Sequence, residues 1–364
     1  MRIGVPREIK NREYRVGLTP PSAAELIAAG HEVVVERDAG AGIDFDDSDY
    51  VAVGARIVQS AAEVFAASDM IVKVKEPQPQ EIALLEPRHV LFTYLHLAAD
   101  KPQAEGLMRS GATCIAYETV TDARGSLPLL KPMSEVAGRM SIQVGAHYLE
   151  KEQGGRGVLL GGVPGVAPAR VAILGGGVAG LNAAQMAVGQ RADVTIYDIN
   201  NTRLAELDTY FGNQIKTGYG SRAAIAAAVA KAHLVIGSVL VPGAAAPKLV
   251  TRDMLKTMKR GSVIVDIAID QGGCVETSRP TTHDDPVFIE EGVIHYCVAN
   301  MPGAVARTSA FALNNATLPF VVKLANLGAE RAMAADPHLA NGLNVSGGKI
   351  RHKAVAEALG LPLN

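Results

Sequence analysis

Tryptophan is absent from this chain of 364 residues, and aromatic residues make up only 4% of it. The three cysteines, Cys114, Cys274 and Cys297, lie far apart without paired spacing, which argues against a disulfide framework or a zinc cluster. The first residues, MRIGVPREIK, lack the apolar core of a signal peptide, and the longest apolar stretches are broken by Arg, Pro or Gly clusters. We therefore expect a soluble protein of a reducing compartment, the cytoplasm, with no membrane association and no metal site.

Charge is also nearly balanced, with a formal net charge of −2. This balance indicates neither a nucleic acid nor an anionic membrane as a partner. What the chain does contain is apolar residues, 48% of the total, and 37 glycines. A chain of this length exceeds the usual limit for a single core, so we expect two domains.

Short apolar runs alternate with helix-like segments from the first residue onward, which predicts an open α/β unit over residues 1–130. A helix follows from residue 131, with Pro132 near its start and Ser134 as its expected cap. The connection GGRGVLLGGVPGVAPAR is rich in turns, and a second set of parallel strands extends to residue 306. Residues 307–364 are expected to be helical, to be interrupted at Pro319 and, lacking strands, to pack on the first unit. The predicted fold is α/β, with two open, doubly wound, parallel-sheet (Rossmann-like) domains and a cleft between them: 1–130 plus 307–364, and 131–306.

A glycine-rich turn stands at the start of the second unit, in VAILGGGVAG. Gly175 permits a tight turn after a strand, Gly177 permits close approach of a pyrophosphate, and Gly180 permits close packing of helix on strand. The free amides of the following helix then face phosphates. A second strand, VTIY, ends at Asp198, which suits a carboxylate that binds a ribose diol and repels a 2′-phosphate, so NAD is favoured over NADP. The alternative is that Asp198 is only a turn residue.

Polar side chains also stand where other strands are expected to end. In MIVKVK, Lys73 and Lys75 share one strand face, either to meet an anion or as solvated lysines of an edge strand. His96 is either a proton carrier near neutral pH or a partly buried histidine bonded to a backbone carbonyl.

Two further charged residues complete the candidate set. Asp270 shares an alternating face with Asp266 and Ala268 if the strand VIVDIAID extends that far. Asp270 then either lies at the mouth of a ligand-binding crevice or only caps the turn that follows the strand. Arg15 lies among several charges in VPREIKNREYR and, taken alone, is equally consistent with a solvated loop. Together, Arg15, Lys75, His96 and Asp270 supply a carboxylate fork, a cationic anchor, a proton shuttle and a second acid, which suits a small amino or oxo acid.

Six motifs occur in one order along the chain: VPREIKNREYRVGLTP, KVKEP, YLHLA, LLGGVPGV, ILGGGVAG and DIAIDQGG. In these motifs, nearly from end to end, the chain resembles the alanine dehydrogenases. The resemblance implies that Arg15 and Lys75 bind the substrate and that His96 and Asp270 are the catalytic acid/base residues. For the cofactor NAD it implies, beside the glycine turn, Ser134, Val178, Ala179, Asp198, Arg203, Val239, Leu240, Ile267, Asp270, Arg279, Val298 and Met301. Gly220 replaces a serine of some relatives, directly before Ser221.

The implied reaction converts L-alanine, NAD and water to pyruvate, ammonium and NADH, through an iminium and a carbinolamine. A homo-oligomer, commonly a hexamer, is also implied. Three alternatives remain: the nucleotide-binding subunit of a proton-translocating NAD(P) transhydrogenase, a lysine-forming amino-acid dehydrogenase, and a catalytically silent NAD-sensing protein.

Overall fold

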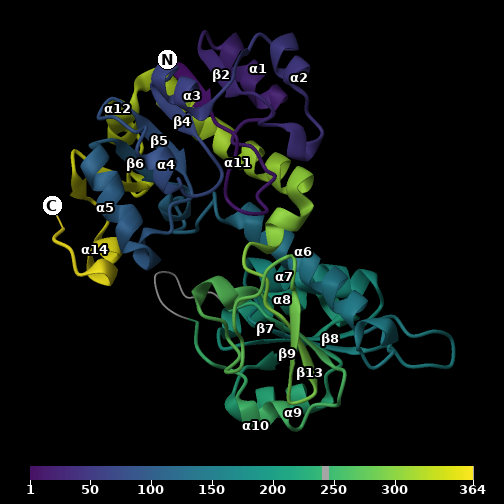
Figure 1. Cartoon of the computed structure of the whole chain (residues 1–364). Helices are drawn as coiled ribbons and strands as arrows, with labels where there is room; N and C mark the ends of the chain where they lie inside the picture. The colour runs from purple at the N-terminus through teal and green to yellow at the C-terminus, as the bar shows by residue number, and fades with distance from the viewer. Residues whose placement is uncertain (240–245, 364) are drawn as a thin grey trace. The chain divides into compact units, whose positions relative to one another are not determined.

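The computed structural model describes residues 1–239 and 246–363. The chain forms two compact units, residues 1–133 with 305–364 and residues 134–304. Each has its own sheet, and many of their helices and strands are labelled in Figure 1. Within the described residues, no helix is long and apolar enough to cross a membrane.

Unit 1 is built on an eight-stranded sheet in the order β15-β14-β6-β5-β4-β1-β2-β3. Its strands are β1 (Arg2–Val5), β2 (Glu32–Glu36), β3 (Arg56–Val58), β4 (Met70–Val72), β5 (Val90–Thr93), β6 (Thr113–Ala116), β14 (Leu343–Ser346) and β15 (Lys349–Ile350). The strands β1 to β6 pair in parallel, and the order reverses direction between β1 and β4. This reversal makes a doubly wound sheet, in which ligands bind beyond the carboxyl ends of the strands.

Helices cover both faces of this sheet because successive strand residues point to opposite sides. Val33 and Val35 pack in the core beneath α1 (Pro20–Ala28), α2 (Asp47–Ala52), α11 (Ala306–Leu327), α12 (Ala329–Ala335) and α13 (Pro337–Ala340). Val34 packs in the opposite core beneath α3 (Ala61–Ala67), α5 (Lys101–Ser110) and α14 (Lys353–Leu359), while α4 (Pro79–Ile82) contacts α5. Pro20 at the first position of α1 fits a helix start, where a missing N–H costs nothing.

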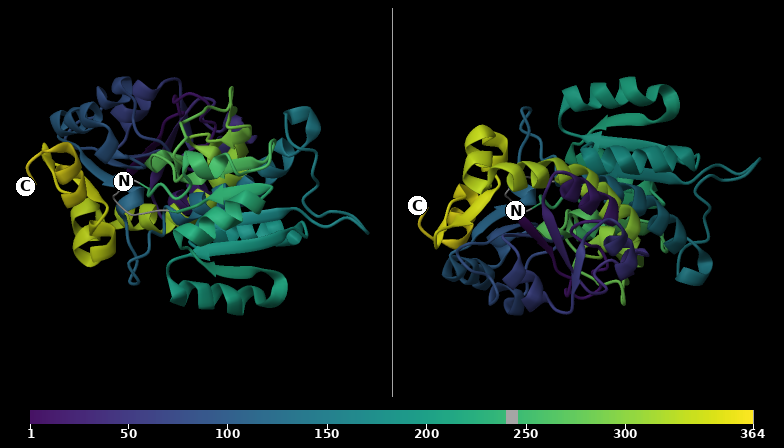
Figure 2. Two further views of the ribbon diagram at one scale, coloured as in Figure 1. Left: turned by 90° about the horizontal axis from the view of Figure 1, so that it is seen from below. Right: turned by 90° about the horizontal axis from the view of Figure 1, so that it is seen from above.

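The C-terminal segment corrects two expectations. It does contain strands: β14 pairs antiparallel with β6 and with β15 across the tight turn at Gly347 and Gly348, both with positive φ. A two-residue glycine turn of this kind forms a hairpin from strands too short to stand out in the sequence. In both views of Figure 2 this yellow segment lies beside the blue segment of unit 1. The expected interruption at Pro319 is also wrong, because α11 continues through it; buried Leu313 and Val321 on either side offset one lost hydrogen bond.

Unit 2 contains a seven-stranded sheet in the order β12-β13-β11-β10-β7-β8-β9. Its strands are β7 (Arg170–Leu174), β8 (Asp193–Asp198), β9 (Lys216–Tyr219), β10 (Leu234–Gly237), β11 (Val263–Asp266), β12 (Val287–Glu290) and β13 (Val293–Tyr296). All neighbours are parallel except β12, an antiparallel edge strand that was not predicted. The order reverses between β7 and β10, so the doubly wound prediction is confirmed for both units.

The helices of unit 2 are α7 (Val178–Gly189), α8 (Asn201–Phe211), α9 (Arg222–Lys231) and α10 (Arg252–Leu255), with most of α6 (Lys131–Tyr148). Because α6 begins at Lys131, Ser134 lies in its first turn and does not cap it. The connection from α6 to β7 is turn-rich as predicted, with one bridge between Val163 and Val166.

Candidate functional site

The cofactor candidates of unit 2 gather where its parallel strands end. The glycine turn follows β7, Asp198 is the last residue of β8, and Val239 comes two residues after β10. Ile267 and Asp270 follow β11, while Val298 and Met301 follow β13. The carboxyl ends of parallel strands share one edge of a sheet, and the turn after β7 stands at the reversal of strand order, where doubly wound proteins bind nucleotides.

Backbone geometry explains the glycines of this turn. Gly175 has a φ of 101°, a backbone conformation that residues with a side chain rarely adopt. A Cβ on Gly180 would lie 1.9 Å from the carbonyl oxygen of Gly175, so only glycine lets α7 pack this closely on β7. A Cβ on Gly177, the residue that precedes α7, would meet nothing within 4 Å. The position of Gly177 is therefore open and, with the helix amides of Val178 and Ala179, fits a pyrophosphate.

Asp198 and Arg203 both bind the peptide groups of Gly176. The Gly176 N–H donates to Asp198 Oδ2 at 2.7 Å, and Arg203 Nε donates to the Gly176 carbonyl at 2.6 Å. Asp198 Oδ1 accepts from the N–H of Asn200 at 2.9 Å, so this carboxylate has the turn role that was the alternative prediction for it. These contacts hold the acid beside the glycine turn before any ligand arrives.

Position 220 adjoins the same acid. The Gly220 N–H donates to the Asp198 carbonyl at 2.9 Å, and a Cβ on Gly220 would lie 3.5 Å from the Asp198 carbonyl carbon, an ordinary contact. Ser221 caps α9 by accepting from the N–H of Ala224. A serine at position 220 would therefore fit, and its absence here reflects no lack of room.

The end of β11 differs from the expectation of an extended strand. The strand stops at Asp266, and Ile267–Gln271 form a 3-10 helix, so Asp266, Ala268 and Asp270 do not share an alternating face. The cause is Asp266 itself: its buried carboxylate accepts from the N–H groups of Ala268 and Cys274 and from the hydroxyl of Ser278. The capping role thus belongs to Asp266, and Asp270 is exposed.

The other predicted cofactor residues of unit 2 have varied surroundings. Arg279 stacks on Phe288, with its guanidinium carbon 4.1 Å from the ring centroid. Val298 and Met301 are buried, Ile267 and Val239 are half-buried, and Leu240 lies outside the described residues. One residue that the sequence analysis missed is Ser238, whose hydroxyl bonds to the carbonyls of Leu174 and Gly175 at 2.9 Å and so ties the end of β10 to the glycine turn.

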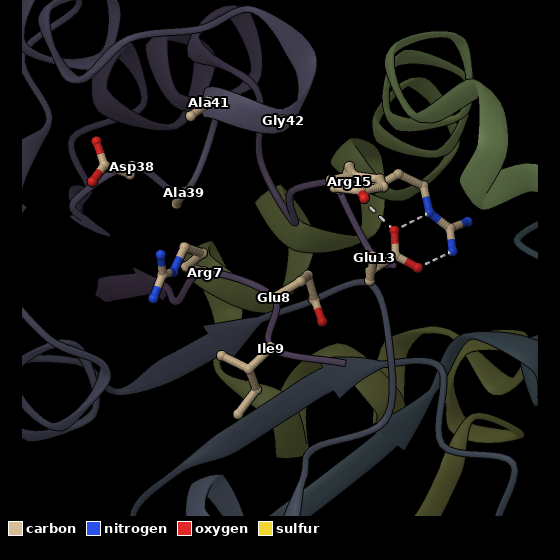
Figure 3. A pocket seen from close by; sticks show the side chains of 10 residues that line it. Arg7, Glu8, Ile9, Glu13, Arg15, Asp38, Ala39, Ala41 and Gly42 are labelled. Carbon is tan, nitrogen blue, oxygen red and sulfur yellow. Dashed lines mark hydrogen bonds and ion pairs between the residues drawn. The ribbon is translucent and has the colours of Figure 1, made fainter. Parts of the chain in front are cut away.

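In unit 1, Arg15 lies in the loop between β1 and α1 and is only 2% exposed, so the solvated-loop alternative is wrong. Its Nε and Nη2 donate to the two carboxylate oxygens of Glu13 at 2.6 and 2.5 Å, and Nη1 lies 3.0 Å from the sulfur of Met133. Both residues line a cavity of about 450 Å³. Figure 3 shows the pair among the side chains that line it. Burial alone would lower the pKa of Arg15, but the hydrogen bonds and charge of Glu13 outweigh it and raise that pKa.

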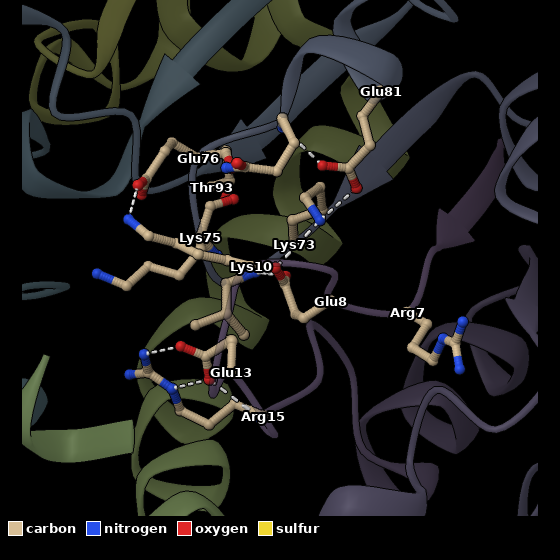
Figure 4. A network of polar contacts seen from close by, with 12 residues as sticks. Arg7, Glu8, Lys10, Glu13, Arg15, Lys73, Lys75, Glu76, Glu81 and Thr93 are labelled. Atoms are coloured by element: carbon tan, nitrogen blue, oxygen red, sulfur yellow. Dashed lines mark hydrogen bonds and ion pairs between the residues drawn. The ribbon is translucent and has the colours of Figure 1, made fainter. Parts of the chain in front are cut away.

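Lys73 is fully buried, which corrects the alternative of an edge strand with solvated lysines. Strand β4 ends at Val72 and lies between β1 and β5, so it is an interior strand. Lys73 Nζ pairs with Glu8 at 3.1 Å and with Glu81 at 2.6 Å, as Figure 4 shows. Burial raises the pKa of Glu8, and the charge of Lys73 opposes this rise.

Lys75 is held through its backbone. Its N–H donates to Glu8 Oε1 at 3.3 Å and its carbonyl accepts from the hydroxyl of Thr93 at 2.9 Å. Lys75 is half-buried, and the neighbouring Glu76 forms an ion pair with Lys10. The segment after β4 is therefore anchored to the loop after β1.

His96 follows β5 in the left-handed region, with φ 51°, and is exposed rather than partly buried. Its N–H donates to Glu118 at 2.7 Å, and its ring stacks on Tyr94 at a centroid distance of 5.7 Å. Within the part of the chain that the structure describes, neither imidazole nitrogen of His96 bonds to a backbone carbonyl, so that alternative is wrong. Arg15, Lys75 and His96 thus follow β1, β4 and β5, which are neighbours in the sheet.

Three acids of unit 1 that were not predicted as site residues are buried: Glu8, Glu13 and Glu81. The alternating glutamates and basic residues in PREIKNREYR were the available signal for Glu8 and Glu13, of which Glu13 pairs within this loop, with Arg15, and Glu8 pairs with Lys73. No group of three or more His, Cys, Asp or Glu side chains that could hold a metal occurs within residues 1–239 and 246–363.

Family models and similar proteins of known function match nearly the whole chain. The model of the alanine dehydrogenase/PNT N-terminal domain matches residues 4–137, and that of the C-terminal domain matches residues 141–353. An alanine dehydrogenase of Halomonas elongata is 59% identical over 361 residues, which cover 99% of this chain and 97% of that protein. The alanine dehydrogenase of Bacillus subtilis is 55% identical, covering 99% and 95%.

Solved structures also resemble this chain. A structure of an L-alanine dehydrogenase is 56% identical, with a TM-score of 0.96 and 99% of each chain covered. The structure of a transhydrogenase from Sinorhizobium meliloti is 26% identical, with a TM-score of 0.82, and 97% of this chain and all of that chain are covered.

Two doubly wound units, one with a glycine turn at its strand reversal and an acid at the end of the neighbouring strand β8, are typical of dinucleotide-binding oxidoreductases. The family models and the relatives narrow this class. The chain belongs to the alanine dehydrogenase/PNT family. Its family and Rossmann-like fold indicate NAD as the cofactor and an NAD-dependent amino-acid dehydrogenase as the enzyme class.

Proposed function

We propose that this protein catalyses the reversible oxidative deamination of L-alanine to pyruvate and ammonium. The similarity to alanine dehydrogenases over 99% of the chain supports the reaction. The observation that carries it is the succession of a buried arginine, a lysine and an exposed histidine after neighbouring strands β1, β4 and β5.

Unit 1, predicted as residues 1–130 plus 307–364, is the substrate domain in this proposal. Arg15 binds the substrate carboxylate, a role supported by its planar fork of donors and by its position beside the cavity. Lys75 provides a second cationic contact, to the carboxylate or to the oxo group of pyruvate. Two cations suit an anion as small as pyruvate.

His96 carries the proton that the deamination must move. Imidazole side chains are the usual general acids and bases in catalysis, and the exposed ring of His96 on a hydrogen-bonded backbone supports this role. Asp270 is the second acid/base residue, orienting water or ammonia and stabilising nearby positive charge.

Unit 2, predicted as residues 131–306, holds NAD. The open position of Gly177 fits the pyrophosphate, and Asp198 fits the ribose diol. When bound there, NAD would supply the acceptor for the hydride that leaves the α-carbon of alanine. The remaining candidates are Ser134, Gly175, Val178, Ala179, Gly180, Arg203, Val239, Leu240, Ile267, Asp270, Arg279, Val298 and Met301.

We also propose a cytoplasmic homo-oligomer, a hexamer by analogy with the family, whose partners are small molecules and not nucleic acid or membrane. Light scattering after size-exclusion chromatography tests the hexamer: a mass near six chains supports it, and a monomer contradicts it.

An assay of NADH formation across small amino acids tests the proposed reaction. L-alanine should be the best substrate. Binding of NADH without turnover would instead favour the NAD-sensing protein, and turnover with larger oxo acids a lysine-forming enzyme. Hydride transfer only between NADH and an NADP analogue would favour a transhydrogenase subunit. This alternative is motivated by the similarity to the transhydrogenase structure that is 26% identical.

A further inference from the structure

Glu13 and Arg15 form a fully enclosed ion pair within an irregular loop. The side chain of Glu13 is 0% exposed and that of Arg15 is 2% exposed. Glu13 accepts three hydrogen bonds from Arg15: from Nε at 2.6 Å, from Nη2 at 2.5 Å and from the backbone N–H at 3.1 Å. No helix or strand includes either residue, so these bonds, together with the contact of Nη1 with the Met133 sulfur at 3.0 Å, orient the guanidinium.

Stability alone does not explain such a pair. Removing two charges from water costs several kcal/mol per ion, and apolar residues of similar volume often stabilise a core as well or better. A bidentate carboxylate–guanidinium pair does, however, fix direction as well as distance. Arg15 is thus held rigidly at the wall of a cavity that Glu13 also lines (Figure 3).

Glu13 also limits the charge that Arg15 presents. A buried arginine with an internal counter-ion offers directed donors but little net charge, whereas one without it attracts any small anion. The pair therefore favours a carboxylate that matches the geometry of the donors over an inorganic anion.

We propose that Glu13 is a positioning residue that orients Arg15 for the substrate carboxylate and suppresses binding of inorganic anions. This inference rests on the proposed function, because it assigns the substrate carboxylate to Arg15. Glu13 does not touch the reacting atoms, and it acts only through the guanidinium.

The test is Glu13→Gln, which keeps the size of the side chain but turns an acceptor oxygen into a donor group that opposes the guanidinium. The KM for pyruvate should rise about tenfold or more, while kcat falls less than about threefold and NADH affinity is unchanged. Chloride, varied at constant ionic strength with a bulky organic anion, should become a competitive inhibitor against pyruvate. An unchanged KM together with chloride insensitivity would overturn the proposal.

Glu81→Gln is the matched control, because Glu81 is an equally buried glutamate of unit 1 that pairs with Lys73 and not with Arg15. It should lower stability without creating chloride inhibition. If Glu13→Gln does not fold, Glu13→Asp tests the proposal instead, because it keeps the negative charge but shifts the position of the guanidinium. The KM for pyruvate should then rise without chloride inhibition. An unchanged KM would overturn the proposal. Wild-type activity with alanine is measured first, so failure of the proposed function is seen separately.

Discussion

Asp198 accepts a hydrogen bond from the N–H of Gly176 at 2.7 Å, which joins the acid at the end of β8 to the turn at the end of β7. The residue proposed to select the ribose is therefore positioned by the loop proposed to bind the phosphates.

Asp198→Asn should relax cofactor selection. The amide keeps one acceptor for Gly176 but loses the charge that repels a 2′-phosphate, so the ratio of NADPH to NADH dissociation constants should fall about tenfold. Fluorescence titration of both nucleotides measures this ratio. An unchanged ratio would mean that selection lies elsewhere.

Substitutions of two glycines of the turn should have different effects, one on the stability of the fold and the other on NADH binding. Gly180→Ala places a Cβ 1.9 Å from the Gly175 oxygen, so the free energy of unfolding should fall by about 1–3 kcal/mol. Gly177→Ala meets no atom within 4 Å and should change stability by less than about 1 kcal/mol, yet weaken NADH binding. Urea unfolding and NADH titration measure the two effects. Gly189→Ala, also without contacts in α7, is the control: it should neither lower the stability nor weaken NADH binding. Equal stability of the first two variants would contradict the packing argument.

His96 is best tested with asparagine. An alanine at φ 51° would add backbone strain, whereas asparagine tolerates the left-handed region and lacks a titrating ring. His96→Asn should lower kcat about 10²- to 10⁴-fold, with NADH affinity and unfolding midpoint nearly unchanged. Ordinary turnover in this variant would exclude the shuttle role.

Cys114 should make the protein less stable in alkali. Burial raises the pKa of this thiol to about 12, from about 9 in an exposed chain. The unfolded chain loses this proton first, so the contribution is complete below pH 9 and is lost as the pH rises from 9 towards 12. Urea midpoints at pH 8, 9 and 10 measure the slope. Cys114→Ala should flatten it by up to about 1.4 kcal/mol per pH unit, and an identical slope would contradict the assignment.

Sequence patterns predicted the strands, helices and turns that depend on neighbouring residues. They did not predict the burial of charged side chains, which depends on partners distant in the sequence. The strand runs, the glycine turn and the Asp198 position follow from nearby residues, and the predicted fold was confirmed. The burial of Arg15, in the loop before α1, could not be predicted because it depends on Glu13 and Met133. The burial of Lys73, directly after β4, depends in the same way on Glu8 and Glu81. Similarly, the end of β11 was misplaced because Asp266 draws its partners from Cys274 and Ser278.

The chain leaves the first unit at residue 133 and returns at residue 305. During synthesis from the N-terminus, residues 134–304 emerge as one uninterrupted segment and can fold as soon as they are complete. The sheet of the first unit must wait for β14, which pairs with β6 across more than half of the sequence. The domain that begins the protein is therefore finished last, and a truncation near the C-terminus should damage the sheet that starts at Arg2 before it damages the one that starts at Arg170.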